Sequence, residues 1–530
     1  MRGRSVTSIV AALAIVSTPR VWAQQEERPT FRSGARLVEL SIVVTDRTGN
    51  AVTTLSGDDF QIFDEGKPQK IAFFSLEAGR ATPPAAAAPT RNPQEFSNRI
   101  PDTGAVTIIL FDQLNTGFAE GANVRSHLVK FLEQIQPSDR VGLYALRGAG
   151  SLRVLHDFTS DGAALVRAVS RLGGNVSIEL EGEQDGARLD AEMQELMTGT
   201  SGESGGTAMM RHFRGVRAVA TIDALESIGH HLAGVQNRKN LIWVSAGFPL
   251  VGFDDRGRSK TGEINRATRA LSDANVAVYT VDARGLMPAF SGGGRKPIFT
   301  TLSMVAENQD ILRSTAEETG GRAFLNTNDI NGAIRRAADD ARVTYVVGYY
   351  PTNQLWDGRF HNVRVKVNRP GLEVRHRKGY VATATQKQAH ALRSAALQAA
   401  LASPIDASGL GVGLRVDPVE GQPHDYRLTV RVAPSGIALE QSGEESVGAI
   451  DAVVAQVRAD GAEGRSLDRT LNIRASGERL QQFLRDGLTF AQTVTLHPEA
   501  ERLRIVVRDV RTGAVGAIGI SRRQLQSIPR

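Results

Sequence analysis

Four largely apolar runs, each followed by a stretch with helical periodicity, constrain the fold of this chain most. The runs occupy residues 106–111, 141–146, 240–245 and 276–281. Strands that are apolar along their whole length lie in parallel sheets whose two faces are covered by helices. We therefore predict an α/β fold over residues 105–342, with a doubly wound, mostly parallel sheet of the Rossmann-like kind.

Polar residues end three of these runs, namely Asp112, Ser245 and Asp282. In open parallel sheets ligands bind beside the carboxyl ends of the strands, so this edge is the candidate binding site. The polar, glycine-rich residues 173–215 interrupt the alternation of strands and helices. We interpret them as an insertion that lies over the strand ends.

All-β patterns flank the α/β region on both sides. Residues 24–80 and 343–382 each contain short alternating strands, and neither segment is large enough to bury a core alone. We expect residues 36–77 to pair with residues 343–381 in one composite β domain. Its core would be formed by Phe60, Ile62, Phe73, Phe74, Val363, Val365, Val367 and Val374.

Composition and periodicity predict the remaining segments. Residues 81–104 are rich in proline and alanine, which is typical of a linker. Residues 383–405 have the pattern of a helical linker. The short alternating segments of residues 406–530 favour a β-sandwich-like C-terminal domain.

The first 23 residues contain the parts of an export signal in order. A basic start that includes Arg2 precedes the apolar stretch 8–17, and Val21 and Ala23 place small residues at a cleavage site. The alternative is a buried N-terminal helix. We expect export to the periplasm or beyond, with a mature chain that begins at Gln24. No later stretch of 18 apolar residues occurs, so no transmembrane segment is expected in the mature chain.

Charge and cysteine content exclude several classes of function. The chain has a formal net charge of +6, and removal of the export signal takes away three arginines and no acid. The remaining excess is small and is not clustered, so we expect no nucleic-acid partner. The absence of cysteine excludes disulfides, thiolate metal sites and a cysteine nucleophile.

The α/β region resembles a von Willebrand factor A (VWFA) domain. The resemblance rests on 111–116 (FDQLNT) after the first strand and on 241–247 (LIWVSAG) after a later one. The chain up to residue 381 is also similar to the VWFA-related family described from acidobacteria, whose motifs it carries in order. These motifs are 43–46 (VVTD), 64–69 (DEGKPQ), 237–242 (NRKNLI), 281–286 (VDARGL), 345–351 (YVVGYYP) and 370–375 (PGLEVR).

The resemblance implies a metal-ion-dependent adhesion site at the strand ends. In that site an Asp-x-Ser-x-Ser loop, a threonine and a second aspartate bind a divalent cation such as Mg²⁺. Asp112 and Thr116 match the first and last positions of the loop. Leu114 replaces the middle hydroxyl, and Ala246 stands where the second acid would lie. The resemblance therefore implies a degenerate site.

Other side chains extend the candidate ligand set. Asn115 offers an oxygen beside the missing hydroxyl, and Thr207 is the candidate threonine of the second loop, with Val219 as the alternative at that position. Asp254 and Asp255 are candidates for the missing charge. We expect at most weak binding of Mg²⁺ or another divalent cation, and no other cofactor. The alternative is that the first aspartate only caps the turn that follows it.

These observations favour an exported, non-catalytic protein that binds a partner protein of unknown identity through the strand-end face. One alternative is a structural envelope protein without a ligand site. Another is a serine hydrolase, because Ser204 lies in a G-x-S-x-G sequence at 202–206. That motif requires a strand before the serine and a helix after it, whereas a polar, helical pattern precedes Ser204.

Overall fold

A six-stranded sheet lies at the centre of the α/β region in the computed structural model. The strand order is β11-β10-β9-β6-β7-β8. All neighbouring pairs are parallel except β7 with β8, which is antiparallel. The strands are β6 (Val106–Asp112), β7 (Val141–Leu146), β8 (Leu152–Thr159), β9 (Lys239–Ser245), β10 (Val276–Asp282) and β11 (Ala323–Phe324).

The structure describes the following residues: 37–78, 92–100, 106–173, 177, 180–181, 205–235, 238–248, 261–286, 298–353, 359–382, 390–459 and 461–529. Residues 37–530 group into one unit by their contacts. Within the described part, no helix has the length and apolar character needed to cross a membrane.

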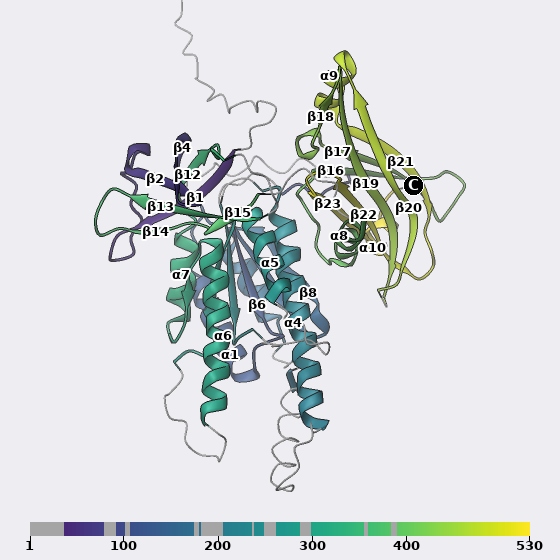
Figure 1. The fold of residues 1–530 in the computed structure, drawn as a ribbon. Helices are drawn as coiled ribbons and strands as arrows, with labels where there is room; N and C mark the ends of the chain where they lie inside the picture. Colours follow the sequence, from purple (N-terminus) through teal and green to yellow (C-terminus); the bar gives the residue numbers. More distant parts are fainter. Residues whose placement is uncertain are drawn as a thin grey trace, which may run out of the picture. The chain divides into compact units, whose positions relative to one another are not determined.

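Helices cover both faces of the six-stranded sheet (Figure 1). On one face α1 (Phe118–Leu132), α2 (Gly162–Ser170) and α7 (Ile330–Asp339) bury apolar side chains against the strands. On the other face the covering helices are α4 (Gly205–Leu232), α5 (Thr261–Asp273) and α6 (Ile298–Thr319). The doubly wound, mostly parallel sheet that the apolar runs predict is therefore present.

The predicted insertion at 173–215 is shorter than expected, because α4 already begins at Gly205. The first turn of this long helix has the sequence Gly-Gly-Thr-Ala, which gives no apolar stripe by which its start could be predicted. The edge strand β8 and the short strand β11 also escaped prediction. Outside the regular helices and strands of Figure 1, short 3-10 turns occupy Gly57–Asp59, Gly148–Gly150 and Pro434–Gly436.

Two four-stranded sheets join the chain before the α/β region to the chain after it. The first has the order β14-β1-β12-β4 and the second the order β15-β13-β2-β3. The strands before the α/β region are β1 (Val38–Thr45), β2 (Phe60–Asp64), β3 (Lys67–Gln69) and β4 (Ile71–Ala78). Those after it are β12 (Val343–Tyr349), β13 (Phe360–Val367), β14 (Glu373–Arg375) and β15 (Gly379–Val381).

The predicted pairing of residues 36–77 with 343–381 is visible in the strand register. Leu40 in β1 pairs with Val347 in β12, and Ile62 in β2 pairs with Val365 in β13. Phe60, Ile62, Val363 and Val365 are buried in one core, with Phe74, Val367 and Val374 packed against it. Phe73 is not part of this core. Successive side chains of a strand point to opposite faces, so Phe73 and Phe74 cannot both face inward.

The C-terminal region is a pair of antiparallel sheets around one apolar core. One sheet contains β5 (Glu95–Ser97), β16 (Val412–Pro418), β17 (Asp425–Val432) and β21 (Leu488–Thr495). The other contains β18 (Glu440–Ser442), β19 (Glu445–Arg458), β20 (Glu463–Ala475), β22 (Ala500–Asp509) and β23 (Val515–Ser521). The helix α9 (Gly477–Asp486) connects the two sheets, and α10 (Arg522–Gln526) follows the last strand.

The interpretation of residues 81–104 as a linker needs correction, because β5 adds a strand to the C-terminal sheet. Gly413 of β16 pairs with Ser97, and Phe96 packs against the core of the two sheets. The Asn98 side chain donates to the carbonyl oxygens of Ala407 and Leu410 at 2.5 and 2.7 Å. Proline and alanine dominate the composition of 81–104 and conceal this short strand.

The expected helical linker at 383–405 contains α8 (His390–Ala402). Leu397 and Leu401 of α8 are buried against Val453 and Val506 of the C-terminal region. This helix is therefore part of a packed core and does more than connect two domains.

Candidate functional site

The carboxyl ends of three neighbouring strands bring the predicted polar residues together. Ser245 at the end of β9 pairs in register with Asp282 at the end of β10. On the other side of β9, Val244 pairs with Phe111, so Asp112 is level with Ser245. The three strand ends therefore form one polar row at the edge where a parallel sheet binds ligands.

Asp112 is fully buried at the centre of a hydrogen-bond network. Its Oδ2 accepts hydrogen bonds from Asn115 Nδ2 at 2.9 Å, Trp243 Nε1 at 3.1 Å and Ser245 Oγ at 2.8 Å. Its Oδ1 accepts from the backbone N–H of Asn115 at 3.1 Å. Both carboxyl oxygens are therefore engaged by donors of the protein itself.

Burial raises the pKa of Asp112 above its ordinary value, because a carboxylate loses solvation in the protein interior. The hydrogen bonds from Asn115, Ser245 and Trp243 oppose this rise, because they stabilise the charged form. The carboxyl group holds two strands and a loop together and has no face open to solvent.

Two side chains of α4 complete the network through contacts with Asn115. Arg217 Nη1 donates to Asn115 Oδ1 at 2.8 Å, and Asn115 Nδ2 donates to Thr221 Oγ1 at 2.8 Å. The Thr221 hydroxyl in turn donates to the backbone carbonyl of Arg217 at 2.8 Å. All three side chains are buried. A positively charged guanidinium thus lies one side chain away from the Asp112 carboxyl group.

Arg217 and Thr221 were not among the site residues predicted from the sequence. Their spacing of four residues places them on one face of α4, where they interrupt an apolar stripe that includes Ala218, Ile222 and Leu225. The arginine and the threonine within an otherwise apolar helix face could have indicated these site residues, because a buried charge needs a partner.

The other predicted ligands have structural roles or lie outside the described residues. Thr116 is buried, and its Oγ1 accepts from the backbone N–H of Ala246 at 3.3 Å. Leu114 is part of the apolar core beneath the sheet edge, so a side chain at this position points away from a surface ion. Thr207 belongs to the first turn of α4, but its side chain is not described. Ser204, Asp254 and Asp255 also lie outside the described residues.

This arrangement does not fit a divalent cation. Asp112 and Asn115 use the oxygens that would bind the ion, and the guanidinium of Arg217 already supplies a positive charge. Among the residues that the structure describes, no group of three or more His, Asp or Glu side chains could hold a metal ion. The donor set suits a closed network with its own cation.

Asp282, at the end of the neighbouring strand β10, is also paired with a cationic side chain of the protein. Arg284 Nε and Nη2 donate to its two carboxyl oxygens at 2.9 and 2.8 Å, and Gln309 Nε2 donates at 3.2 Å. Asp282 is fully buried. The 281–286 motif of the family resemblance therefore forms an internal bidentate ion pair.

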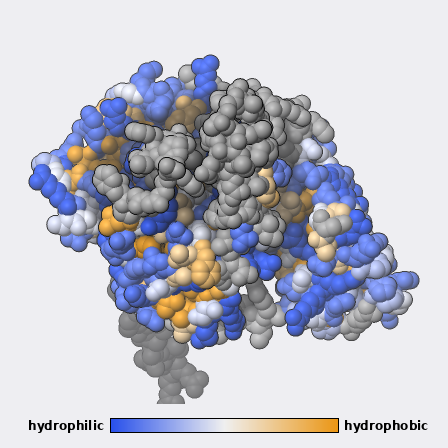
Figure 2. Space-filling model, turned by 90° about the horizontal axis from the view of Figure 1, so that it is seen from below, coloured by the Kyte–Doolittle hydropathy of each residue, from blue (hydrophilic) through white to orange (hydrophobic). Residues whose placement is uncertain are grey.

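Large hydrophobic side chains are exposed at the same edge. Phe118 is the first residue of α1, directly after the loop that follows Asp112, and 63% of it is exposed. Leu286 lies four residues past the end of β10 and is 59% exposed. Figure 2 looks onto the end of the α/β region at which α4 and α6 begin, where hydrophobic patches lie between hydrophilic residues.

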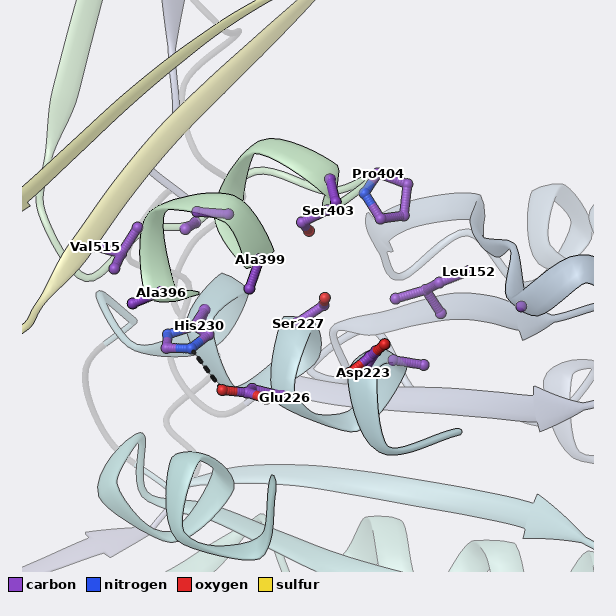
Figure 3. Close-up of a pocket in the computed structure, with 15 residues that line it drawn as sticks. Leu152, Asp223, Glu226, Ser227, His230, Ala396, Ala399, Ser403, Pro404 and Val515 are labelled. Carbon is purple, nitrogen blue, oxygen red and sulfur yellow. Dashed lines mark ion pairs between the residues drawn. The ribbon is translucent and has the colours of Figure 1, made fainter. Parts of the chain in front are cut away.

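A separate pocket of about 240 Å³ lies between α4 and α8 (Figure 3). Asp223, Glu226, Ser227 and His230 of α4 line one wall. Four alanines of α8 line the opposite wall, namely Ala396, Ala399, Ala400 and Ala402. His230 Nε2 lies 3.8 Å from the Glu226 carboxylate, which is the ion pair drawn in Figure 3. This pocket was not predicted from the sequence.

No known family profile matches this chain, and no curated protein matches it. A solved structure of an aerotolerance-related membrane protein from Bacteroides fragilis is 13% identical and covers 45% of this chain and 98% of its own, with a TM-score of 0.25. BatB from Bacteroides thetaiotaomicron is 13% identical, with coverages of 45% and 100% and a TM-score of 0.24.

The VWA domain of SpRpn10 is 12% identical and covers 44% of this chain and 96% of its own, with a TM-score of 0.20. At TM-scores this low, the three likenesses establish neither the fold nor the function of this chain.

Proposed function

We propose that this chain is an exported, non-catalytic protein with a VWFA-like domain, and that its strand-end face binds a partner protein without a divalent cation. The observation that carries the proposal is the exposure of Phe118 and Leu286 around a closed polar network. Exposed large hydrophobic side chains mark interaction sites when they gather on one face.

The closed network supports a binding role because it fixes the loops that present the hydrophobic residues. Asp112 and Thr116 tie the loop before α1 to β9 and to Ala246. The Arg284–Asp282 ion pair holds the start of the loop after β10 against the end of that strand, and the backbone N–H of Leu286 donates to Asn328 Oδ1 at 2.8 Å. A face held in one conformation loses little entropy when a partner binds to it.

Capture from an envelope extract of the source organism tests this proposal. The immobilised mature chain is compared with a Phe118→Ser/Leu286→Ser double variant and with the control Leu484→Ser, which removes a 49% exposed leucine of α9. We expect a partner that the control retains and the double variant loses, and we expect EDTA to have no effect.

Capture by all three proteins would contradict the assignment of the face. If no partner is captured at all, the structural envelope protein becomes the better account. Labelling of the intact chain by a serine-hydrolase probe, lost on Ser204→Ala, would instead favour the hydrolase.

Export is tested separately by N-terminal sequencing of the secreted or periplasmic protein. We expect Gln24 as the first residue, because Val21 and Ala23 suit signal peptidase. An exported chain that retains Met1 would contradict this part of the proposal.

A further inference from the structure

The strand β21 lies at one edge of its sheet in the C-terminal region, and among the described strands it pairs with β17 only. Its eight residues pair with β17 in one uninterrupted register. The strand contains no charged residue, no proline and no glycine. A long, regular and uncharged edge strand can pair with a further strand, and proteins usually protect such edges.

The other long edge strands of the described residues are protected. Charged side chains lie on β4, β8 and β20, and examples are Glu77, Arg153 and Asp468. Each of these three strands also has an irregular register with its neighbour. Backbone hydrogen bonds from the segment 407–410 cover β23. Charge, irregularity or a covering segment thus protects each of these edges, and β21 has none of the three.

The backbone of β21 offers hydrogen-bonding groups at the open edge. The N–H of Leu496 donates to the carbonyl oxygen of His424 at 2.7 Å, directly beyond the register of β21 with β17. In an antiparallel pair, every second residue bonds to the neighbouring strand. The even-numbered residues of β21 therefore bond to β17. The backbone groups that face the open edge belong to three exposed residues, Thr489, Ala491 and Thr493.

Side chains of the described residues leave most of this edge free. Gln492 Nε2 donates to the carbonyl oxygen of Thr493 at 2.9 Å, and this oxygen can accept a second hydrogen bond. Gln456 Nε2 donates to the carbonyl oxygen of Thr495 at 2.9 Å, so the free stretch ends at Thr493. The stretch available for pairing is therefore 489–493.

The sequence of this stretch is symmetric about Ala491. A two-fold axis at Ala491 would place Thr489 opposite Thr493 of a second copy and the two alanines opposite each other. Threonine pairs across strands are favourable, and no like charges would meet. Phe490 packs against the core of the two sheets but is only partly buried, so an added strand would cover it further. These features favour a second copy of this chain over a partner of different sequence.

We propose that β21 pairs antiparallel with β21 of a second copy, centred on Ala491, and that the protein forms a symmetric dimer in this way. The three outward residues of each strand would exchange about six backbone hydrogen bonds. A two-fold interface requires the same surface on both copies, and this edge meets that requirement. The dimer does not involve the strand-end face, so it does not depend on the proposed partner protein.

Single cysteines test the register on the full mature chain, because the chain contains no cysteine of its own. Cα atoms in a hydrogen-bonded antiparallel pair lie about 5.5 Å apart, which a disulfide can bridge. Ala491→Cys should therefore give a cross-linked dimer on a non-reducing gel after mild oxidation. The matched control is Ala72→Cys, at an exposed alanine of the edge strand β4, and it should remain monomeric.

Charge variants test the same contact without a covalent bond. Ala491→Lys and Ala491→Glu each place like charges opposite each other, so sedimentation equilibrium should show dimerisation weakened about tenfold or more. An equimolar mixture of the two variants should restore the dimer, because opposite charges then meet. Ala72→Lys should dimerise like the wild type.

A wild-type chain that stays monomeric at every concentration measured would overturn the proposal. A dimer that Ala491→Lys leaves unchanged, or equal cross-linking of Ala491→Cys and Ala72→Cys, would overturn it as well. Circular dichroism checks that each variant is folded. A mixture of Thr489→Cys and Thr493→Cys replaces Ala491→Cys if the latter does not fold. If the monomer instead binds an extended segment of another protein and Ala491→Lys abolishes this, the edge serves a different partner and self-pairing is wrong.

Discussion

Arg217 Nη1 lies 2.8 Å from Asn115 Oδ1, and this hydrogen bond joins α4 to the loop that follows β6. The side-chain Nδ2 of Asn115 in turn donates a hydrogen bond to Asp112 Oδ2 at 2.9 Å. Unlike a bound metal ion, the guanidinium is covalently part of the chain and cannot be removed by a chelator. The strand-end network therefore carries a permanent cation where the family resemblance implies an exchangeable metal ion.

Arg217→Met should destabilise the protein by about 1–3 kcal/mol, because Asn115 Oδ1 would be left buried without this donor. Urea denaturation followed by circular dichroism measures the change. Arg167→Met on α2 is the matched control, because 62% of the Arg167 side chain is exposed. Its effect should stay within about 0.5 kcal/mol. Equal losses in both variants would argue against a special role for the buried arginine.

Phe60→Ala tests whether the strands on either side of the α/β region share one core. The Phe60 ring lies 5.7 Å from the ring of Phe74 and 5.1 Å from that of Tyr345, measured between centroids. Loss of this buried ring should cost about 3–5 kcal/mol of unfolding free energy. Phe118→Ala removes an exposed phenylalanine and should change stability by less than about 0.5 kcal/mol. A loss below about 1 kcal/mol for Phe60→Ala would contradict the shared core.

His231 should make the stability of the protein depend on pH below neutrality. Burial lowers the pKa of His231 from its ordinary 6.5, and the backbone carbonyl of Asp406 only partly offsets this. The unfolded chain therefore binds the proton more readily than the folded one. The stabilisation is fully present above 6.5 and is lost as the pH falls through the lowered pKa, by at most about 1.4 kcal/mol per pH unit.

Unfolding free energies between about pH 8 and about pH 5 measure this dependence. His231→Gln should flatten the curve relative to the wild type, because it removes the titrating group. His230→Gln, a change at a side chain that is 39% exposed, is the control and should keep the slope. If both variants follow the wild-type curve, the half-buried His231 does not contribute to the pH dependence.

The arrangement of the strand ends was predictable because it follows from local patterns. Apolar runs that end in Asp112, Ser245 and Asp282 imply parallel strands, and parallel strands bring their carboxyl ends to one edge. The pairing of the flanking β segments was predictable from size, because neither segment can bury a core alone.

The partners of these residues were not predictable, because they come from distant parts of the chain. The 237–242 motif is an example: Arg238 donates to the backbone carbonyls of Ser41 and Gly320 at 3.1 and 2.6 Å. These contacts join β1 to the α/β region, so the Arg238 side chain of this motif has a structural role. The pocket between α4 and α8 likewise depends on how two helices separated by more than 150 residues approach each other.

We propose that the strand-end network is stable without a metal ion, and a comparison of the melting temperature with and without Mg²⁺ tests this proposal. A site with a dissociation constant of about 10 μM would add roughly 2.7 kcal/mol of stability at about 1 mM Mg²⁺. That gain corresponds to a rise of several degrees for domains of this size. We predict that Mg²⁺ and EDTA give the same melting temperature within about 1 °C, because Asp112 and Asn115 already use their oxygens. A rise of several degrees with Mg²⁺ that disappears in Asp112→Ala would instead show that a metal ion binds at the strand ends.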